Sequence, residues 1–202
     1  MNLFVYTCLL LVIGSNAFAQ TDYEKNLIEY QASLDEEYEN PDESPLEGKA
    51  LRKFKGHRFF PIDEKYKVTA RFIKSDNPAF FQMKTTTRRI ADYDIYGIAQ
   101  FDLNGKSFTL NIYQSHRLRK MEQYKDDLFL PFIDLTNGEE TYAAGRYIDL
   151  SIPEGNEIII DFNKAYNPYC VYSYKYSCPI PPLENSMDTR VEAGIMAPKK
   201  KR

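Results

Sequence analysis

The chain from residue 66 onward alternates apolar and polar positions with a period of two. In the segment 66–72 every second side chain is apolar, and Lys67, Thr69 and Arg71 lie between them. Such alternation is typical of a β-strand with one buried and one solvated face. Further short strands are predicted at 79–84, 90–96, 128–133, 144–150 and 157–162. Many short strands with short connections predict an antiparallel β-sandwich or barrel, mainly β in class and on the border of α+β.

Turn sequences between these strands predict how the strands pair. Asn104-Gly105 is a preferred pair for a two-residue type I′ hairpin, and it places Phe101 opposite Phe108. Residues 75–78 (Ser-Asp-Asn-Pro) are expected to form another turn. Residues 153–156 (Pro-Glu-Gly-Asn) are expected to fold the last two strands back on each other. The apolar run 158–160 lacks polar alternation, which favours burial on both faces.

The N-terminal region has a different period. From residue 22 the apolar positions recur every three or four residues, as on one face of a helix: Tyr23, Leu27, Tyr30, Leu34 and Tyr38. Thr21 and Glu24 fit a capping box at the start of an amphipathic helix, and Pro41 should end it at Asn40. The other helix face is acidic and is expected to be solvated. Residues 41–65 are expected to be irregular surface chain.

Residues 1–19 carry no charged side chain and contain an apolar run from Leu3 to Ile13. Ala17-Phe18-Ala19 then supplies the small-x-small pattern of a cleavage site. The run is shorter than the ~20 residues that span a bilayer. We therefore expect a signal peptide, a mature chain from Gln20 without a stable membrane span, and a periplasmic or secreted destination. No Lys or Arg precedes the run, and an uncleaved anchor is the alternative.

Composition places the rest of the chain among ordinary globular domains. A length of 202 residues, 43% of them hydrophobic and 27% charged, fits one domain with a sizeable core. The expected organisation is a helix and linker over 20–43, a single β-rich domain over 44–196 and a solvated basic tail over 197–202. The net charge of −3 gives no general attraction to nucleic acid. Sixteen Tyr, thirteen Phe and no Trp are typical of half-buried strand positions.

Two cysteines, Cys170 and Cys178, would remain after cleavage of the signal peptide. An even number of cysteines in an oxidising compartment predicts a disulfide. Zinc is the rival interpretation, but the seven intervening residues exceed the usual spacing of ligand pairs. Only His57 and His116 could supply nitrogen ligands. We therefore expect neither a metal nor a cofactor.

Polar side chains concentrate between residues 134 and 185, beside predicted strand ends where they can converge on one rim. Arg146 could grip a carboxylate or phosphate through two hydrogen bonds, and we expect it to face Asp161 or another carboxylate. Asp and Asn beside Pro and Gly also cap turns, so purely structural roles are the alternative. The candidate ligand-binding residues are Asp134, Glu140, Arg146, Asp161, Asn163, Tyr166, Asn167, Glu184 and Asn185.

Through these residues the chain resembles the bacterial family catalogued as domain of unknown function 1684. The resemblance extends roughly over residues 44 to 195. It implies a shared fold and a shared polar rim, but no catalytic residue, because the family carries no assigned activity. The motifs that carry it are at 60–63, 68–70, 131–134, 140–147, 161–168, 178–182 and 184–185.

Three functions are left open by the sequence. The first is an exported β domain that binds a small polar or anionic ligand at a rim of Arg146, Asp161, Asn163 and Tyr166. The second is a hydrolase that uses two of the carboxylates for acid-base chemistry. The third is a structural or assembly partner in the cell envelope, with the acidic helix as its contact surface. A nucleophile elbow, a glycine-rich phosphate loop and an H-E-x-x-H motif are all lacking, so enzyme activity is undecided.

Overall fold

A computed structural model describes residues 21–198 of the chain. The described chain contains the helices α1 (Asp22–Glu39) and α2 (Gly48–Lys53). Its strands are β1 (Lys67–Lys84), β2 (Ile90–Leu103), β3 (Lys106–Ser115), β4 (Asp127–Phe132), β5 (Arg146–Ser151) and β6 (Glu157–Asp161). The predicted class, mostly antiparallel β with an N-terminal helix, is confirmed.

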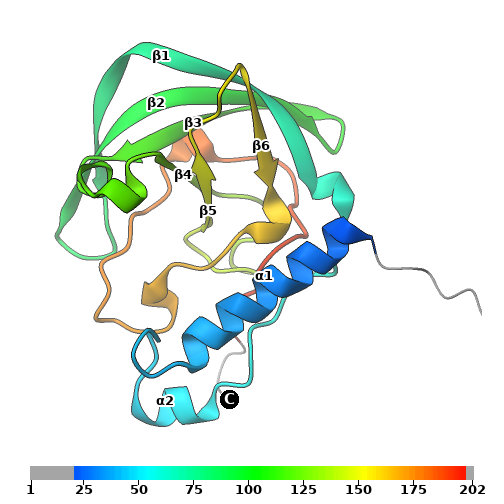
Figure 1. Ribbon diagram of the computed structural model, residues 1–202, viewed down its shortest axis with the longest axis vertical. Helices are drawn as coiled ribbons and strands as arrows, with labels where there is room; N and C mark the ends of the chain where they lie inside the picture. The colour runs from blue at the N-terminus through cyan, green and yellow to red at the C-terminus, as the bar shows by residue number, and fades with distance from the viewer. Residues whose placement is uncertain (1–20, 199–202) are drawn as a thin grey trace, which may run out of the picture.

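The six strands form one antiparallel sheet in the order β5-β4-β3-β2-β1-β6, which curls into a nearly closed barrel. Figure 1 shows β1 and β2 arching over one side of the molecule and α1 lying across the opposite end. The prediction that the 153–156 turn pairs β5 with β6 is wrong, because β6 pairs with β1 and β5 with β4. The free edge of β5 bonds instead to the chain after β6: Tyr147 and Tyr166 exchange N–H···O bonds of 3.0 and 2.9 Å. The barrel is therefore open at a seam between its two edge strands, β5 and β6.

The predicted hairpin at Asn104-Gly105 is confirmed. Asn104 and Gly105 have φ angles of 51° and 75°, and a type I′ turn requires positive φ at both central positions. The turn sets the predicted register, in which Phe101 lies opposite Phe108. Local turn chemistry and the hydrophobic pattern agree here, which makes the register of β2 and β3 unambiguous.

The first two strands are longer than the sequence suggested. Residues 75–78 were expected to turn, but β1 continues through them with a register shift between Lys74 and Ala79. Pro78 has no N–H to donate, so the ladder is interrupted there by an irregularity rather than by a reversal of the chain. The predicted strand 90–96 is likewise only the first part of β2, which has its own shift between Ile95 and Gly97.

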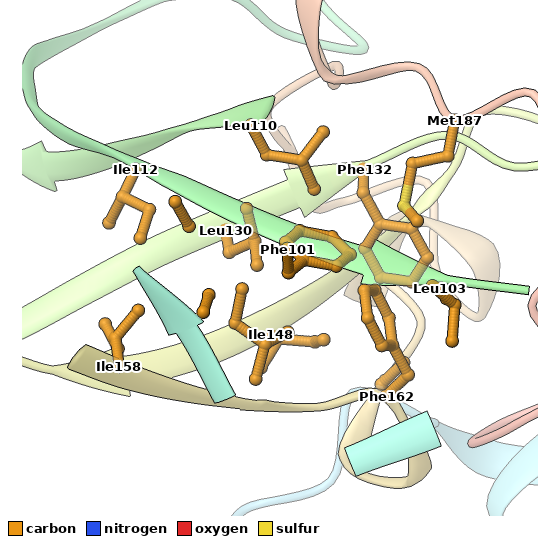
Figure 2. Packing of buried hydrophobic residues seen from close by; sticks show 14 of the residues in the cluster. Phe101, Leu103, Leu110, Ile112, Leu130, Phe132, Ile148, Ile158, Phe162 and Met187 are labelled. Atoms are coloured by element: carbon orange, nitrogen blue, oxygen red, sulfur yellow. The ribbon is translucent and has the colours of Figure 1, made fainter. Parts of the chain in front are cut away.

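Apolar side chains from all six strands fill the barrel. Figure 2 shows Phe101, Phe132 and Phe162 grouped at the centre, and the ring of Phe162 lies 5.9 Å from Phe101 and 5.2 Å from Phe132. Ile158 and Ile160 point into this core, whereas Ile159 is 55% exposed. The prediction that 158–160 is covered on both faces is therefore wrong. The reason is that β6 lies at the edge of a single curved sheet, which has only one buried face there.

The N-terminal helix begins and ends as predicted. Thr21 Oγ1 accepts the Glu24 N–H at 3.2 Å, and α1 stops before Asn40. The segment 41–65, expected to be irregular, contains the short helix α2. Its Lys, Ala, Leu and Arg residues favour helix, and no Pro interrupts them.

No helix among residues 21–198 has both the length and the apolar character that a membrane crossing needs.

The segment 185–197 closes one end of the barrel. The Asn185 carbonyl accepts the Ile133 N–H at 3.0 Å, and the Gly194 carbonyl accepts the Phe60 N–H at 3.0 Å. Met187, Val191 and Ala193 from this segment belong to the barrel core. The last part of the described chain is therefore built into the hydrophobic interior.

Candidate functional site

A cavity of about 780 Å³ lies between the outer face of the barrel and α1. Side chains alternate along β4 and β5, so that Leu130 and Ile148 point into the core while Phe129, Tyr147 and Asp149 line the cavity. Parts of α1, the 115–124 connection and the 166–179 segment complete the lining. A volume of this size falls within the range of ~300–1,000 Å³ that is usual for small-molecule sites.

Aromatic rings cover much of the cavity surface. Four of them form a continuous series in which neighbouring ring centroids are 5.7, 4.8 and 5.7 Å apart: Tyr93, Phe129, Tyr147 and Tyr166. Phe129 and Tyr147 meet at 70°, and Tyr147 and Tyr166 meet at 85°. The ring of Tyr147 on β5 therefore stands at a steep angle to both of its neighbours, so the series presents both faces and edges.

The carboxylate of Asp149 is the most unusual polar group of the lining. Tyr166 donates its hydroxyl to both carboxylate oxygens at 2.9 Å. Within the described residues no basic side chain forms an ion pair with Asp149. Asp149 is exposed to solvent, but the protein atoms around it partly desolvate its carboxylate, and this desolvation raises its pKa to about 6. The Tyr166 hydroxyl lowers that pKa, and the nearby charge of Asp127 raises it further.

Negative charge predominates in the cavity. Glu37, Asp127 and Asp149 line it, and within the described part of the chain Arg117 is the one basic side chain of the lining. A shallower hollow on the other side of Tyr169 shares Glu37 and adds further glutamates of α1 and the following turn. The carboxylates of α1 thus extend from the cavity to the surrounding surface.

Tyrosine hydroxyls hold α1 over the cavity. Tyr30 donates to the Lys164 carbonyl at 2.9 Å, and Tyr169 donates to Glu37. Burial raises the pKa of both hydroxyls, so they remain protonated donors at neutral pH. These bonds connect the helix to the segment that follows β6.

Of the nine candidate residues from the sequence, only Tyr166 lines this cavity. Arg146 is fully buried and pairs with Asp134 at 2.9 Å, so its partner is Asp134 rather than Asp161. Its other hydrogen bonds go to the carbonyls of Val191 (2.8 Å), Ala193 and Ile195 (3.3 Å). The Arg146–Asp134 pair thus joins β5 to the C-terminal segment.

Asp161 and Asn163 form a separate cluster at the N-terminal end of α1. Tyr23 donates its hydroxyl to both oxygens of Asp161 at 3.1 Å. Asn163 donates to the Tyr23 hydroxyl at 3.0 Å and to the Asp63 carbonyl at 2.9 Å. This cluster docks α1 onto the end of β6.

The remaining candidates lie in other places. Asn185 is buried and bonds to the backbone of Asn111 and Pro131, whereas Glu184 is exposed. Glu140 pairs with Arg190 at 2.5 Å. Asn167 bonds to Tyr172 (3.1 Å) and Met196 (3.0 Å).

The expected disulfide is not present in the structure, where Cys170 and Cys178 are free. The two cysteines are nevertheless neighbours, because their side chains hydrogen-bond and the Cys170 N–H donates to Cys178 Sγ at 3.2 Å. The hydrogen bond between the two cysteine side chains is the main cause that lowers the pKa of the Cys170 thiol to about 6. Within residues 21–198, no group of three or more His, Cys, Asp or Glu side chains could hold a metal.

Sequence reasoning missed the cavity because its residues look ordinary along the chain. Tyr147 and Asp149 occupy alternate positions of a strand, which is the pattern of any solvated face. The one local signal was the density of tyrosines, in α1 and after β6, which was interpreted as half-buried strand positions. Only the packing of α1 over the outer face of β4 and β5 makes these positions a cavity.

Fold and cavity together define an open six-stranded antiparallel barrel with a helix packed over its outer face. The chain belongs to the family described as "Protein of unknown function (DUF1684)", whose model matches residues 52–196. A solved structure with the same fold is the solution NMR structure of the uncharacterized protein from gene locus rrnAC0354 of Haloarcula marismortui. It is 32% identical, covers 87% of this chain and 94% of its own, and has a TM-score of 0.66. Among curated proteins no match is found.

Proposed function

We propose that this protein is a small-molecule-binding module whose ligand occupies the cavity between α1 and the barrel. The observation that carries the proposal is the cavity itself, of about 780 Å³, with an aromatic lining and a carboxylate inside it. Sites for small ligands usually combine an apolar or aromatic lining with a few polar groups that orient the ligand. Asp149 and Tyr166 are such a pair.

In this proposal, most of the polar residues singled out from the sequence stabilise the fold and do not contact the ligand. Arg146 already donates to Asp134 and to three backbone carbonyls, which leaves little of its guanidinium for a ligand. Asp134, Glu140, Asp161 and Glu184, the acids considered for hydrolysis, all lie outside the cavity lining. Binding therefore has more support than hydrolysis by a pair of these carboxylates.

We further propose that the protein works outside the cytoplasm and that Cys170 and Cys178 become oxidised there. Support for export comes from the uncharged apolar run and the Ala17-Phe18-Ala19 pattern. This segment lies outside the described residues. Support for oxidation comes from the contact between the two cysteine side chains. A disulfide would fix the 170–178 segment, and Cys178 itself lines the cavity.

A bulky side chain at the cavity wall tests the binding proposal. Ser33 lines the cavity from α1, whereas its neighbour Ala32 is exposed and outside the lining. Native mass spectrometry of the purified protein, and of small molecules extracted from it, should detect a ligand with the wild type and with Ala32→Trp. The Ser33→Trp variant should retain much less of it. Equal retention by both variants, or no bound molecule in any preparation or added metabolite pool, would count against the proposal.

A further inference from the structure

We propose that the ligand is an organic cation, an ammonium group on a small apolar body, held by Asp149 and the aromatic rings around it. This inference rests on the proposed binding function and names the chemical class of its ligand. It is argued from the unpaired carboxylate, the aromatic surface and the balance of charges in the cavity.

Among residues 21–198, no basic side chain is paired with the carboxylate of Asp149. Its hydrogen-bond partner Tyr166 is neutral, and Asp127, the nearby charge that affects it, has the same sign. Asp149 is exposed but partly desolvated, and a partly desolvated charge gains from an ionic partner. A cationic ligand would supply the missing partner and would remove the repulsion between the two acids.

The rings beside Asp149 suit the other side of such a ligand. A cation over a Tyr or Phe face is attracted by the ring quadrupole, and cages of rings at steep angles are the usual receptors for alkylated ammonium groups. Tyr147 and Tyr166 stand at 85° to each other, and Tyr147 and Phe129 at 70°. These rings also provide apolar surface for the body of the ligand.

The charges of the lining favour a cation over an anion. Glu37, Asp127 and Asp149 outnumber Arg117, and the adjoining hollow adds Glu36 and Glu43. Like charges at this density would repel a carboxylate or phosphate that approached from the side of α1. The anionic ligand that Arg146 suggested from the sequence would therefore have to bind elsewhere.

Choline and 3,3-dimethyl-1-butanol provide a direct test, because they have the same shape and differ in the charge of one atom. Calorimetric titration of the purified protein should detect saturable binding of choline and at least about tenfold weaker binding of the neutral alcohol, a difference of about 1.4 kcal/mol. Choline should also raise the melting temperature in a concentration-dependent way.

Substitution of Asp149 provides the matched control. Asp149→Asn keeps the shape and an acceptor for Tyr166, and it should weaken choline binding about tenfold while leaving the alcohol unaffected. Asp76→Asn removes the same charge from an exposed position outside the cavity, and it should bind choline like the wild type. Choline binding by the wild type should also weaken below about pH 6, where Asp149 takes up a proton.

Each alternative result has a distinct meaning. Equal affinity for choline and the alcohol, or an unchanged affinity in Asp149→Asn, would overturn the cation inference and leave the binding function standing. Binding of neither probe would also overturn the inference. In that case the retention experiment with Ser33→Trp and Ala32→Trp still decides the binding function by itself.

Discussion

At the scale of single residues, the protein holds Arg146 and Asp149 in two different environments, the first buried and the second exposed to solvent. Arg146 and Asp134 neutralise each other and bond to the surrounding backbone, so they contribute to the structure of the barrel end. Asp149 is exposed but partly desolvated, and among the described residues its side chain accepts only the Tyr166 hydroxyl. A partly desolvated charge without an ionic partner reduces stability, and such residues are frequent at functional sites.

The pKa of Asp149 makes this cost measurable. Folding raises that pKa to about 6, above the ~3.9 of an unfolded chain, so the folded state binds the proton more tightly. The ionised carboxylate therefore lowers stability above pH 6, and the penalty disappears as the pH falls towards 4. Asp149→Asn should raise the free energy of unfolding at pH 7.5, by less than about 1 kcal/mol because solvent reaches the site.

Urea denaturation of both proteins between pH 4 and 8 measures this difference. The advantage of Asp149→Asn should fade below pH 6 and be absent at pH 4, and Asp76→Asn should show no such trend. If Asp149→Asn were less stable than the wild type at pH 7.5, the inference that the ionised carboxylate of Asp149 lowers stability would be wrong.

Loss of the buried Arg146–Asp134 pair should have the opposite effect and lower the free energy of unfolding. Arg146→Met leaves the carboxylate of Asp134 buried without a partner, and it should cost roughly 3–5 kcal/mol. Arg190→Met is the control, because Arg190 pairs with Glu139, Glu140 and Glu192 at the surface and its loss should cost about 1 kcal/mol or less. Chemical denaturation at neutral pH compares the two variants. Similar costs for both would mean that burial does not govern these ion pairs.

At the scale of elements, the weak point of the sheet is the junction of β3 and β4. Its ladder consists of the single pair Tyr113 and Phe129. The side-chain amide of Asn185 fills the gap, since it accepts from the Asn111 N–H at 2.9 Å. It also donates to the carbonyls of Asn111 (2.9 Å) and Pro131 (2.8 Å). One amide thus replaces the backbone bonds that a complete ladder would contain.

Removal of that amide should destabilise the whole barrel. Asn185→Ala leaves several partly or fully buried backbone groups without partners and should cost more than about 2 kcal/mol. The neighbouring exposed residue provides the control, because Glu184→Ala should stay within about 0.5 kcal/mol of the wild type. Thermal unfolding of the two variants suffices as the measurement. A mild effect of Asn185→Ala would show that β3 and β4 hold together without this amide.

Elements were more predictable from sequence than the site. The period of two and the Asn104-Gly105 turn are local signals: the first indicated the strand that begins β1, and the second predicted the observed pairing of Phe101 with Phe108. The continuation of β1 through Pro78 was not predictable, because a turn and an irregular strand segment use the same residue types. The cavity depends on which face of β5 meets α1, and no local pattern around Tyr147 or Asp149 contains that information.

At the scale of the whole molecule, α1 is connected to the barrel by hydroxyl groups near its start and at its middle. Tyr23 binds Asp161 and Asn163 near its start, and Tyr30 binds the Lys164 carbonyl further along. The helix therefore closes the cavity through a small number of polar contacts and the burial of Leu27 and Tyr38. Such an element can open locally at a lower free energy than the barrel.

Hydrogen exchange can measure that opening. Tyr23→Phe removes the hydroxyl that satisfies Asp161, and it should accelerate amide exchange throughout α1 by roughly tenfold, which corresponds to about 1.4 kcal/mol. Exchange in β2 and β3 should remain unchanged. Tyr174→Phe is the control, since Tyr174 is 93% exposed and should leave all rates unaffected. Acceleration of α1 and the strands together would mean that the helix and the barrel unfold as one unit.

The backbone acceptors of Arg146 are synthesised later than Arg146 itself. Arg146 is made with β5, whereas the carbonyls of residues 191, 193 and 195 that it binds come after every strand of the barrel. A growing chain that has completed all six strands still lacks these partners, and the guanidinium is better solvated by water than by a half-built interior. Completion of the barrel must therefore wait for the last tenth of the described chain. A chain that folds during synthesis would lack the hydrogen bonds of Arg146 to residues 191, 193 and 195 until this segment has been made.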